Sequence, residues 1–406
     1  MELLNNGGVT SPKGFLASGI HCGLKKNSLK MDLALIYSEV PATAAGVYTK
    51  NKVKGAPLYI TKNHLSNKKA QAIIINSGNA NTCNGVDGLY KANIMAEVQA
   101  RALMLETDEV LVASTGVIGV PLNIDAIKNG IPILTEKLSV NGADDASSAI
   151  ITTDTFKKQF ATQFMLNSKI ITIGAMAKGS GMIEPNMGTM LSFITTDLNI
   201  CGELLNEALK ESVKISYNRV SVDGDTSTND MVLIMANALA LNQKIESKNE
   251  DYYTFLKILN ELNIIVTKSI AKDGEGATKL IECSITNAKA VKDAEALSKS
   301  VINSSLVKTA MFGSDANWGR VLCALGYSTA TFDPNKVDVS FKSSVGEIKV
   351  CSKGGSLEFD EAHAKEILLQ PEINILVNMN DGDASSVSWG CDLSYDYVKI
   401  NGDYRS

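Results

Sequence analysis

Short apolar runs that pass directly into polar, glycine-rich segments are the feature that most limits how this 406-residue chain can fold. Residues 72–75 read as a buried strand, and the Asn- and Gly-rich turn 76–85 follows at once. Residues 110–113 repeat the arrangement and run into the polar segment 114–116. These runs predict strands of a sheet that end in polar loops.

Helical patterns alternate with the strands. Further strands are expected over 170–175 and 190–196, and apolar residues recur at helical spacing in two later segments: Leu205, Leu209 and Val213, then Phe255, Leu259 and Leu262. Because strands and helices alternate without a strict βαβ order, we expect an α/β or α+β fold with a mixed sheet between helical layers. The length suggests two or three compact units, and no segment reads as a linker.

Charge and hydropathy exclude several classes of function. The net charge is −5, and the 39 basic residues are 35 Lys and only four Arg, so a basic face that reads nucleic acid is not expected. The N-terminus lacks the pattern of a signal peptide, and no window approaches the run of about 18 apolar residues that spans a membrane. We therefore expect a cytoplasmic protein that binds neither nucleic acid nor membranes.

The motifs of common metal and nucleotide sites are missing from the sequence. The seven cysteines are scattered and never at CxxC spacing, and the three histidines are far apart, so neither a disulfide framework nor a zinc site is expected. The patterns GxxxxGK[ST], GxGxxG and GxSxG are also missing. If the chain is an enzyme, its base is not expected to be histidine.

Glycine-rich loops with polar side chains are the remaining places where chemistry could occur. The densest follows Lys178, and its methionines indicate a segment packed against protein rather than a flexible linker. Four others combine glycines with hydroxyls, amides or carboxylates: residues 114–119, 223–230, 272–279 and 313–320. The aspartates of 223–230 lack the spacing of an EF-hand. Taken singly, each loop is more typical of a tight connection than of a site.

Seven segments and the C-terminal tail carry a resemblance that runs through nearly the whole chain. They are NSGNANTCNG (76–85), STGVIG (114–119), ITTDT (151–155), KGSGMIEPNMGTMLSF (178–193), NRVSVDGDTSTND (218–230), KDGEGATK (272–279), GSDANWGR (313–320) and 401–406. In this order they resemble the ornithine acetyltransferases of arginine biosynthesis, also called glutamate N-acetyltransferases. The resemblance implies an N-terminal-nucleophile-like layered sandwich of mixed sheets between helices, with a smaller C-terminal α/β domain over about 288–406.

The resemblance also implies that the chain cuts itself once, between Gly188 and Thr189. The Thr189 hydroxyl would attack the preceding carbonyl, and water would hydrolyse the resulting ester. The family usually has Ala before this Thr, but Gly188 is smaller and accepts strained dihedral angles at little cost. The products would be an α chain of 1–188 and a β chain of 189–406, assembled as a heterotetramer with two copies of each.

Cleavage would place an α-amine on the residue that carries the nucleophile. An α-amine has an ordinary pKa of about 7.7–8.0, so near neutral pH a useful fraction can accept the hydroxyl proton. By resemblance, Thr115 and Gly116 form the oxyanion hole. Substrate binding is assigned in the same way to Thr153, Lys178, Thr189, Glu275, Asn401 and Ser406. The family usually ends in Thr, and Ser406 keeps the hydroxyl.

The charges of these residues suit the implied substrates. Lys178 can neutralise an α-carboxylate and Glu275 can hold the cationic amine of ornithine, while the hydroxyls and the amide orient the rest. A second set of polar residues is expected to brace loops rather than to touch substrate: Asn79, Asp154, Asp223 and Asp315.

The implied reaction is a ping-pong acetyl transfer. Thr189 takes acetyl from N2-acetylornithine, ornithine leaves, and the amine of glutamate attacks acetyl-threonine to give N-acetylglutamate. Neither a metal nor a redox cofactor is required. Some family members also use acetyl-CoA as the donor, and no residue of this sequence decides that point. The alternatives are a self-processing aminopeptidase or amidohydrolase of related fold, and a non-catalytic, uncut binding protein.

Overall fold

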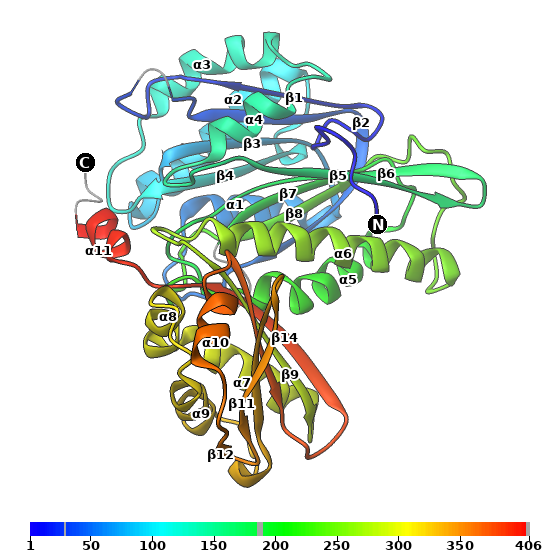
Figure 1. Ribbon diagram of the computed structural model, residues 1–406. Helices are drawn as coiled ribbons and strands as arrows, with labels where there is room; N and C mark the ends of the chain where they lie inside the picture. The colour runs from blue at the N-terminus through cyan, green and yellow to red at the C-terminus, as the bar shows by residue number, and fades with distance from the viewer. Residues whose placement is uncertain (28–29, 185–189, 403–406) are drawn as a thin grey trace. The chain divides into compact units, whose positions relative to one another are not determined.

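A computed structural model describes residues 1–27, 30–184 and 190–402 of the chain (Figure 1). The chain divides into two compact units, which we call the first and the second unit. The first comprises Met1–Gly179, Pro185–Asn218 and Thr226–Val266, and the second comprises Ser180–Glu184, Arg219–Asp225 and Thr267–Ser406.

The first unit contains one mixed sheet. Its strands run in the order β4-β3-β2-β8-β7-β6-β5, with β1 also paired to β2. The pairs β3–β4 and β7–β8 are parallel and the other pairs are antiparallel. The strands are β1 (Phe15–Ile20), β2 (Leu33–Tyr48), β3 (Lys69–Asn79), β4 (Val110–Val117), β5 (Lys158–Leu166), β6 (Lys169–Lys178), β7 (Leu191–Thr196) and β8 (Met231–Ala236).

The long strand β2 bends this sheet. Its pairing with β3 shifts between Tyr37 and Ala42. Ile73 and Ile75 of β3 share one buried core with Phe193 of β7 and Leu233 of β8. Strands β3 and β7 are not neighbours in the sheet, so these side chains meet because the sheet folds over and packs against itself as two layers.

Helices cover the outer faces of the first unit. Ile74 and Val112 point to the opposite face from Ile73 and pack with Met95 of α2 and Ile127 of α3 in a second core. Figure 1 shows α5 and α6 on the other side of the strands from α2 and α3. This arrangement confirms the expected mixed sheet between helical layers. The helices are α1 (Ala56–His64), α2 (Gly85–Leu103), α3 (Ile124–Glu136), α4 (Ala143–Ile150), α5 (Gly202–Ile215) and α6 (Glu250–Lys272).

The second unit is built on a six-stranded mixed sheet in the order β12-β11-β10-β13-β9-β14. Strands β9 and β13 pair in parallel, and the other neighbouring strands of this sheet that the structure describes pair antiparallel. The strands are β9 (Leu280–Ala288), β10 (Asp338–Ser343), β11 (Gly346–Ser352), β12 (Gly355–Ser356), β13 (Glu372–Asn378) and β14 (Ala384–Cys391). The helices are α7 (Val291–Asn303), α8 (Ser305–Phe312), α9 (Trp318–Gly326), α10 (Glu361–Leu368) and α11 (Tyr395–Gly402).

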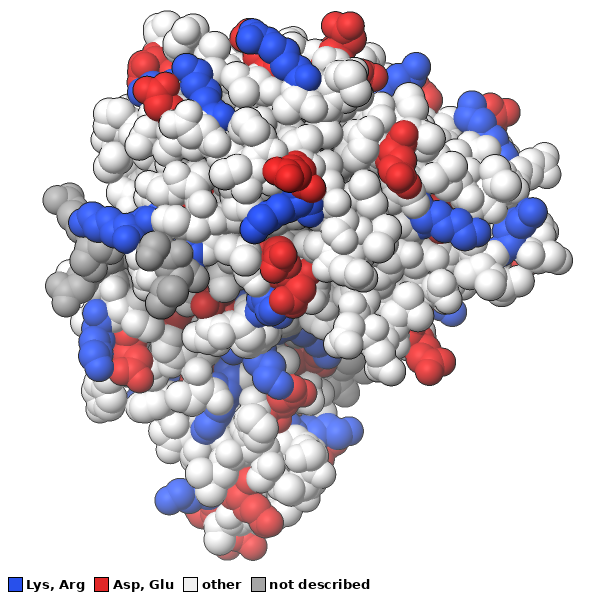
Figure 2. All heavy atoms as spheres, turned by 90° about the horizontal axis from the view of Figure 1, so that it is seen from above, with Lys and Arg blue, Asp and Glu red and all other residues white. Residues whose placement is uncertain are grey.

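A single buried core joins this sheet to its helices. It brings Val301 of α7 and Val321 of α9 together with Val339 and Ile375 from the strands. Within the described ranges, no helix is long and apolar enough to cross a membrane. On the face of the molecule shown in Figure 2, basic and acidic side chains are interspersed.

The strands expected over 72–75 and 110–113 are longer in the structure than the apolar runs suggest. Residues 76–79 and 114–117, expected to be turns, continue β3 and β4. The parallel pairing extends from Asn76 opposite Ser114 to Gly78 opposite Gly116. Polar side chains remain compatible with a strand here because the ladder satisfies the backbone groups. The expected turn at 76–85 is therefore wrong for its first four residues.

Candidate active site

The residues expected to form the oxyanion hole lie at the paired ends of β3 and β4. Gly116 has a φ of +129°. An added Cβ would lie 2.5 Å from the backbone nitrogen of Asn79 and closer still to the carbonyl carbon of Gly78. Because real side chains do not tolerate such a contact, only glycine fits this strand end. Thr115 precedes it and is partly exposed.

A buried polar network holds this strand end. Asn229, from the segment before β8, is 4% exposed and donates a hydrogen bond to the carbonyl oxygen of Ser114 at 3.0 Å. Its side-chain oxygen accepts hydrogen bonds from the hydroxyls of Thr82 (2.5 Å) and Thr228 (2.6 Å). The Ser114 hydroxyl donates to Asn76 at 2.6 Å. The carboxyl end of β4 is therefore fixed by side chains from three distant segments.

Replacing Gly116 by Ala is expected to disrupt this end. The new Cβ has no room, so the backbone must shift. The resemblance assigns an oxyanion donor to Gly116, and the loss of one such donor typically costs about 10²- to 10³-fold in kcat. The control is Gly119→Ala, since Gly119 also has positive φ but no atom within 4 Å of an added Cβ. The measurements are the melting temperature and the kcat of the acetyl transfer that the resemblance implies. Equal effects of the two substitutions would contradict this interpretation.

Asp154 connects the loop that contains Thr153 to the end of β6 through hydrogen bonds. Its carboxylate accepts hydrogen bonds from the backbone N–H of Thr152 (3.0 Å) and of Gly179 (2.7 Å). It also accepts from the Lys158 ammonium group at 2.8 Å, and both of these charged side chains are fully buried. Burial opposes ionisation, but the charges of Lys178 and Lys158 outweigh it and hold the pKa of Asp154 below its usual range. Thr153 and Lys178 are thereby brought to one place.

Lys178 carries a buried positive charge without a hydrogen-bonded counter-ion among the residues that the structure describes. Its side chain is 8% exposed. The charge of Lys178 shifts the pKa values of Asp154, Asp230 and Lys25, so these three side chains lie close enough to Lys178 to feel its charge. Burial lowers the pKa of Lys25 to about 8, and the charge of Lys178 contributes to the lowering. A buried ammonium group in this setting favours an anionic ligand.

Glu275 and Asn401 meet in the second unit. The Asn401 amide donates to the Glu275 carboxylate at 2.8 Å, and Glu275 is 7% exposed. The backbone N–H of Glu275 donates to the carbonyl oxygen of Ser180 at 2.8 Å. A Cβ on Gly181 would collide with the Glu275 carboxylate, so the glycine leaves room for it. Two residues assigned to substrate binding are thus hydrogen-bonded to each other beside the glycine-rich loop.

Asp223 braces the same loop. Its carboxylate accepts the backbone N–H groups of Met182 (2.7 Å) and Ile183 (2.8 Å), and the Tyr397 hydroxyl at 3.2 Å. The other residues expected to brace loops also do so: Asn79 donates to Val120 at 3.0 Å, and Asp315 accepts from Asn317 at 3.0 Å. The structure contains the expected loop contacts of these residues, and that they do not touch substrate stays a prediction.

Gly188, Thr189 and Ser406 lie outside the described residues. The first described residue after Thr189 is Met190, which is 3% exposed. The Met190 carbonyl oxygen accepts the backbone N–H of Met231 at 3.1 Å, and the next residue, Leu191, is paired with Lys178 across β6 and β7.

The family follows from comparison with known proteins. The model of the ArgJ family matches residues 16–406, which is nearly the whole chain. The chain belongs to the ArgJ family. The family predicted from the ordered loops is thereby confirmed.

One curated relative and two solved structures illustrate what the chain is similar to. An arginine biosynthesis bifunctional protein ArgJ 1 of Clostridium acetobutylicum is 54% identical over 406 residues, covering 100% of this chain and 99% of that protein. A solved ornithine acetyltransferase of Mycobacterium tuberculosis, complexed with ornithine, is 40% identical with a TM-score of 0.44, covering 46% of this chain and 98% of that one. A solved aminopeptidase of Ochrobactrum anthropi, described as a variant of the Ntn hydrolase fold, is 10% identical with a TM-score of 0.40, covering 68% and 88%.

Several charged residues around Lys178 in this ArgJ protein could not be found from the sequence. Lys25 donates to the carbonyl oxygens of Met31 (2.7 Å) and Ile151 (2.9 Å), so it reaches the segment that precedes Thr153. Lys158 is one of many lysines, and its complete burial gives no signal in composition. Asp230 closes the segment 218–230 that carried the resemblance, but the sequence pattern assigns it no role.

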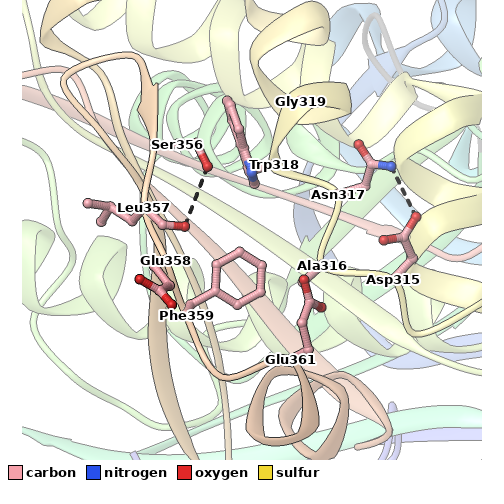
Figure 3. Close-up of a pocket in the computed structure, with 10 residues that line it drawn as sticks. All are labelled: Asp315, Ala316, Asn317, Trp318, Gly319, Ser356, Leu357, Glu358, Phe359 and Glu361. Carbon is pink, nitrogen blue, oxygen red and sulfur yellow. Dashed lines mark hydrogen bonds between the residues drawn. The ribbon is translucent and has the colours of Figure 1, made fainter.

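The loop 313–320 lines a pocket that contains none of the assigned site residues. This pocket of about 510 Å³ belongs to the second unit, and Figure 3 shows the Phe359 ring and the Glu361 side chain facing the segment of Ala316. The start of α9 is capped there by Asn317, whose side chain accepts the backbone N–H of Arg320 at 3.2 Å. In the described part of the chain, no cluster of three or more His, Cys, Asp or Glu side chains is arranged to hold a metal ion.

Proposed function

We propose that the chain is an acetyltransferase that moves acetyl from N2-acetylornithine to glutamate. Membership of the ArgJ family supports this proposal, as do relatives named bifunctional proteins of arginine biosynthesis. The observation that carries it is Lys178, an almost fully buried ammonium group beside the Thr153 loop and the start of β7. A carboxylate is a ligand that suits such a group, and both amino-acid substrates carry an α-carboxylate.

The assigned side chains bind two different parts of the substrate. Lys178 and Thr153 bind the α-carboxylate end that N2-acetylornithine and glutamate have in common. Glu275, oriented by Asn401, binds the side-chain ammonium group that only the ornithine compound carries. The C-terminal Ser406 supplies a further hydroxyl.

The reaction begins with self-cleavage. The Thr189 hydroxyl oxygen bonds to the Gly188 carbonyl carbon, the peptide nitrogen leaves with a proton as the new α-amine, and water hydrolyses the ester. This produces the chains 1–188 and 189–406, which we propose assemble as a tetramer with two copies of each. The cytoplasmic location also stays a prediction.

Acetyl transfer then uses the new terminus as its own base. The α-amine accepts the Thr189 hydroxyl proton while the oxygen attacks the acetyl carbonyl, and the proton passes to the departing amine of ornithine. General-base assistance of this kind is worth roughly 10²- to 10⁴-fold in rate. Thr115 and Gly116 donate to the oxygen that becomes negative. The amine of glutamate attacks acetyl-threonine in the second half-reaction and releases N-acetylglutamate.

The word bifunctional in the names of relatives supports a second donor. We propose that acetyl-CoA also acetylates Thr189, so that the same second half-reaction makes N-acetylglutamate without N2-acetylornithine. Neither route needs a cofactor. In the second route acetyl-CoA is a co-substrate that is consumed as the acetyl donor.

Replacing Glu275 by Gln tests how the two substrates are told apart. The substitution keeps the shape and a hydrogen-bonding group but removes the charge that pairs with an ammonium group. Because charge-assisted bonds contribute about 1.5–3 kcal/mol, the KM for N2-acetylornithine should rise by about tenfold or more, while the KM for glutamate should not rise. The matched control is Glu358→Gln, an exposed position in the same unit. An equal rise in both KM values would count against the assigned role.

A further inference from the structure

A partly buried lysine that the proposed steps do not use lies beside the loop that contains Thr153. The Lys25 ammonium group donates hydrogen bonds to the carbonyl oxygens of Met31 at 2.7 Å and of Ile151 at 2.9 Å. Ile151 precedes Thr153 by two residues. Lys25 therefore holds the backbone that carries a residue assigned to substrate binding.

A buried aspartate fixes the backbone of Lys25. Asp32 is fully buried, and its carboxylate accepts the backbone N–H groups of Leu24 (2.8 Å) and Lys25 (2.9 Å). The backbone carbonyl oxygen of Asp32 accepts the N–H of Ser77 in β3 at 2.9 Å. The base of the Lys25 side chain is thereby held next to the end of β3.

A glycine at this strand end makes room for the Lys25 side chain. A Cβ added to Gly78 would lie 3.2 Å from the Cγ atom of Lys25, which is closer than ordinary packing allows. Gly78 is paired with Gly116, to which the resemblance assigns an oxyanion donor. The Lys25 side chain therefore extends from the paired ends of β3 and β4 to the carbonyl oxygen of Ile151.

The charge of Lys25 adds to that of Lys178. Lys25 forms no ion pair within the part of the chain that the structure describes, and carbonyl oxygens use two of its three N–H donors. The charges of Lys178 and Asp154 both act on Lys25, so these groups lie close together. Asp154 is already paired with the buried Lys158. A carboxylate ligand bound here would be attracted by two ammonium groups.

We propose that Lys25 is a positioning residue of the α-carboxylate site, which holds the segment 151–153 at the end of β3 and acts by its charge, with Lys178, on the substrate carboxylate. The inference rests on the proposed function, because Thr153 and Lys178 receive their substrate roles there. N2-acetylornithine and glutamate share the α-carboxylate, so Lys25 should affect both substrates alike. No covalent bond to Lys25 forms or breaks.

The proposal fixes the sign of a pH effect. Burial lowers the pKa of Lys25 to about 8. The charges of Lys30 and Lys178 also lower this pKa, whereas the charges of Asp32 and Asp154 raise it. Lys25 is therefore mostly charged below about pH 8 and loses its charge as the pH rises through that value. The KM for either substrate should rise over the same range, because the carboxylate then loses one of two positive charges.

The test compares wild type with Lys25→Met and Lys25→Arg. Lys26→Met is the control, because Lys26 is the next residue and is exposed. At about pH 7 we expect Lys25→Met to raise the KM for N2-acetylornithine and for glutamate by about tenfold each, with kcat within about threefold of wild type. The carboxylate is bound before and during the reaction, so its loss changes KM rather than kcat. Lys26→Met should change neither constant.

Lys25→Arg separates the effect of the charge from that of the side-chain shape. Arginine stays charged over the working range, so the KM of this variant should not rise between about pH 7 and about pH 9. The wild-type KM should rise about fivefold over that range. Other groups that titrate near pH 8, including the proposed α-amine, are common to both proteins, so the difference belongs to Lys25.

Three results would overturn the proposal while the proposed function stands. They are unchanged KM values in Lys25→Met, a rise in KM for only one substrate, and the same pH dependence of KM in wild type and Lys25→Arg. The third result would mean that Lys25 only supports the fold. A wild type that transfers no acetyl to glutamate would overturn the proposed function as well. If Lys25→Met does not fold, the pH comparison of wild type with Lys25→Arg decides.

Discussion

Replacing Thr189 by Ala should leave a single uncut chain that transfers no acetyl. The substitution removes the hydroxyl that attacks Gly188 and the same hydroxyl that would carry acetyl, so both steps fail together. Wild type should give bands of about 20 and about 23 kDa on a denaturing gel, from chains of about 188 and 218 residues of the 43.3 kDa product. Thr189→Ala should give one band near full length.

The control for this experiment is Thr189→Ser, which keeps a hydroxyl and an α-amine. It should still be cut and should retain measurable transfer. Wild-type protein that runs as a single full-length band would contradict self-cleavage, as would a Thr189→Ala protein that is cut at the same place. The gel also distinguishes a non-catalytic binding protein, which would stay uncut, from a self-cleaving acetyltransferase or hydrolase.

Replacing Lys178 by Met should weaken binding of both amino-acid substrates. Lys178 is 8% exposed and has no hydrogen-bonded counter-ion among the described residues, so its ammonium group can donate hydrogen bonds to a substrate carboxylate, while Asp154 acts on it through charge alone. A hydrogen bond to a charged group contributes about 1.5–3 kcal/mol, which corresponds to a rise of about 10- to 100-fold in KM for N2-acetylornithine and for glutamate.

Lys157→Met is the matched control, because Lys157 is a nearby lysine whose ion pair with Asp144 is exposed. Exposed pairs contribute little to stability, so this variant should keep both KM values and nearly the same melting temperature. If Lys178→Met changed the KM for only one substrate, the two would not share a carboxylate site at this residue.

The strands and helices with clear periodicity could be predicted from the sequence. The run 170–175 lies inside β6, and the spaced leucines of 205–213 lie on α5. The extension of β3 to residue 79 and of β4 to residue 117 could not be predicted from the sequence. Asn, Ser and Gly normally favour turns, and here the parallel pairing of the two strands overrides that preference. The bend at β2 depends on a register shift that no local pattern marks.

The candidate site could be predicted only from the resemblance, which depends on the order of the glycine-rich segments along the chain. No single residue among Thr153, Lys178 and Glu275 stands out by type, since each belongs to a common class of side chain. The buried pair of Asp154 and Lys158 escaped prediction because burial of a charge is decided by distant segments.

The exchange of acetyl between N2-acetylornithine and glutamate tests the central claim most directly. Purified, cleaved protein is incubated with N2-acetylornithine labelled in the acetyl group, with and without glutamate, and in a parallel reaction with labelled acetyl-CoA. We predict that the label appears in N-acetylglutamate from either donor, with one ornithine released for each acetyl moved from N2-acetylornithine. Release of the label as free acetate, at the same rate with or without glutamate, would contradict acetyl transfer and indicate a hydrolase.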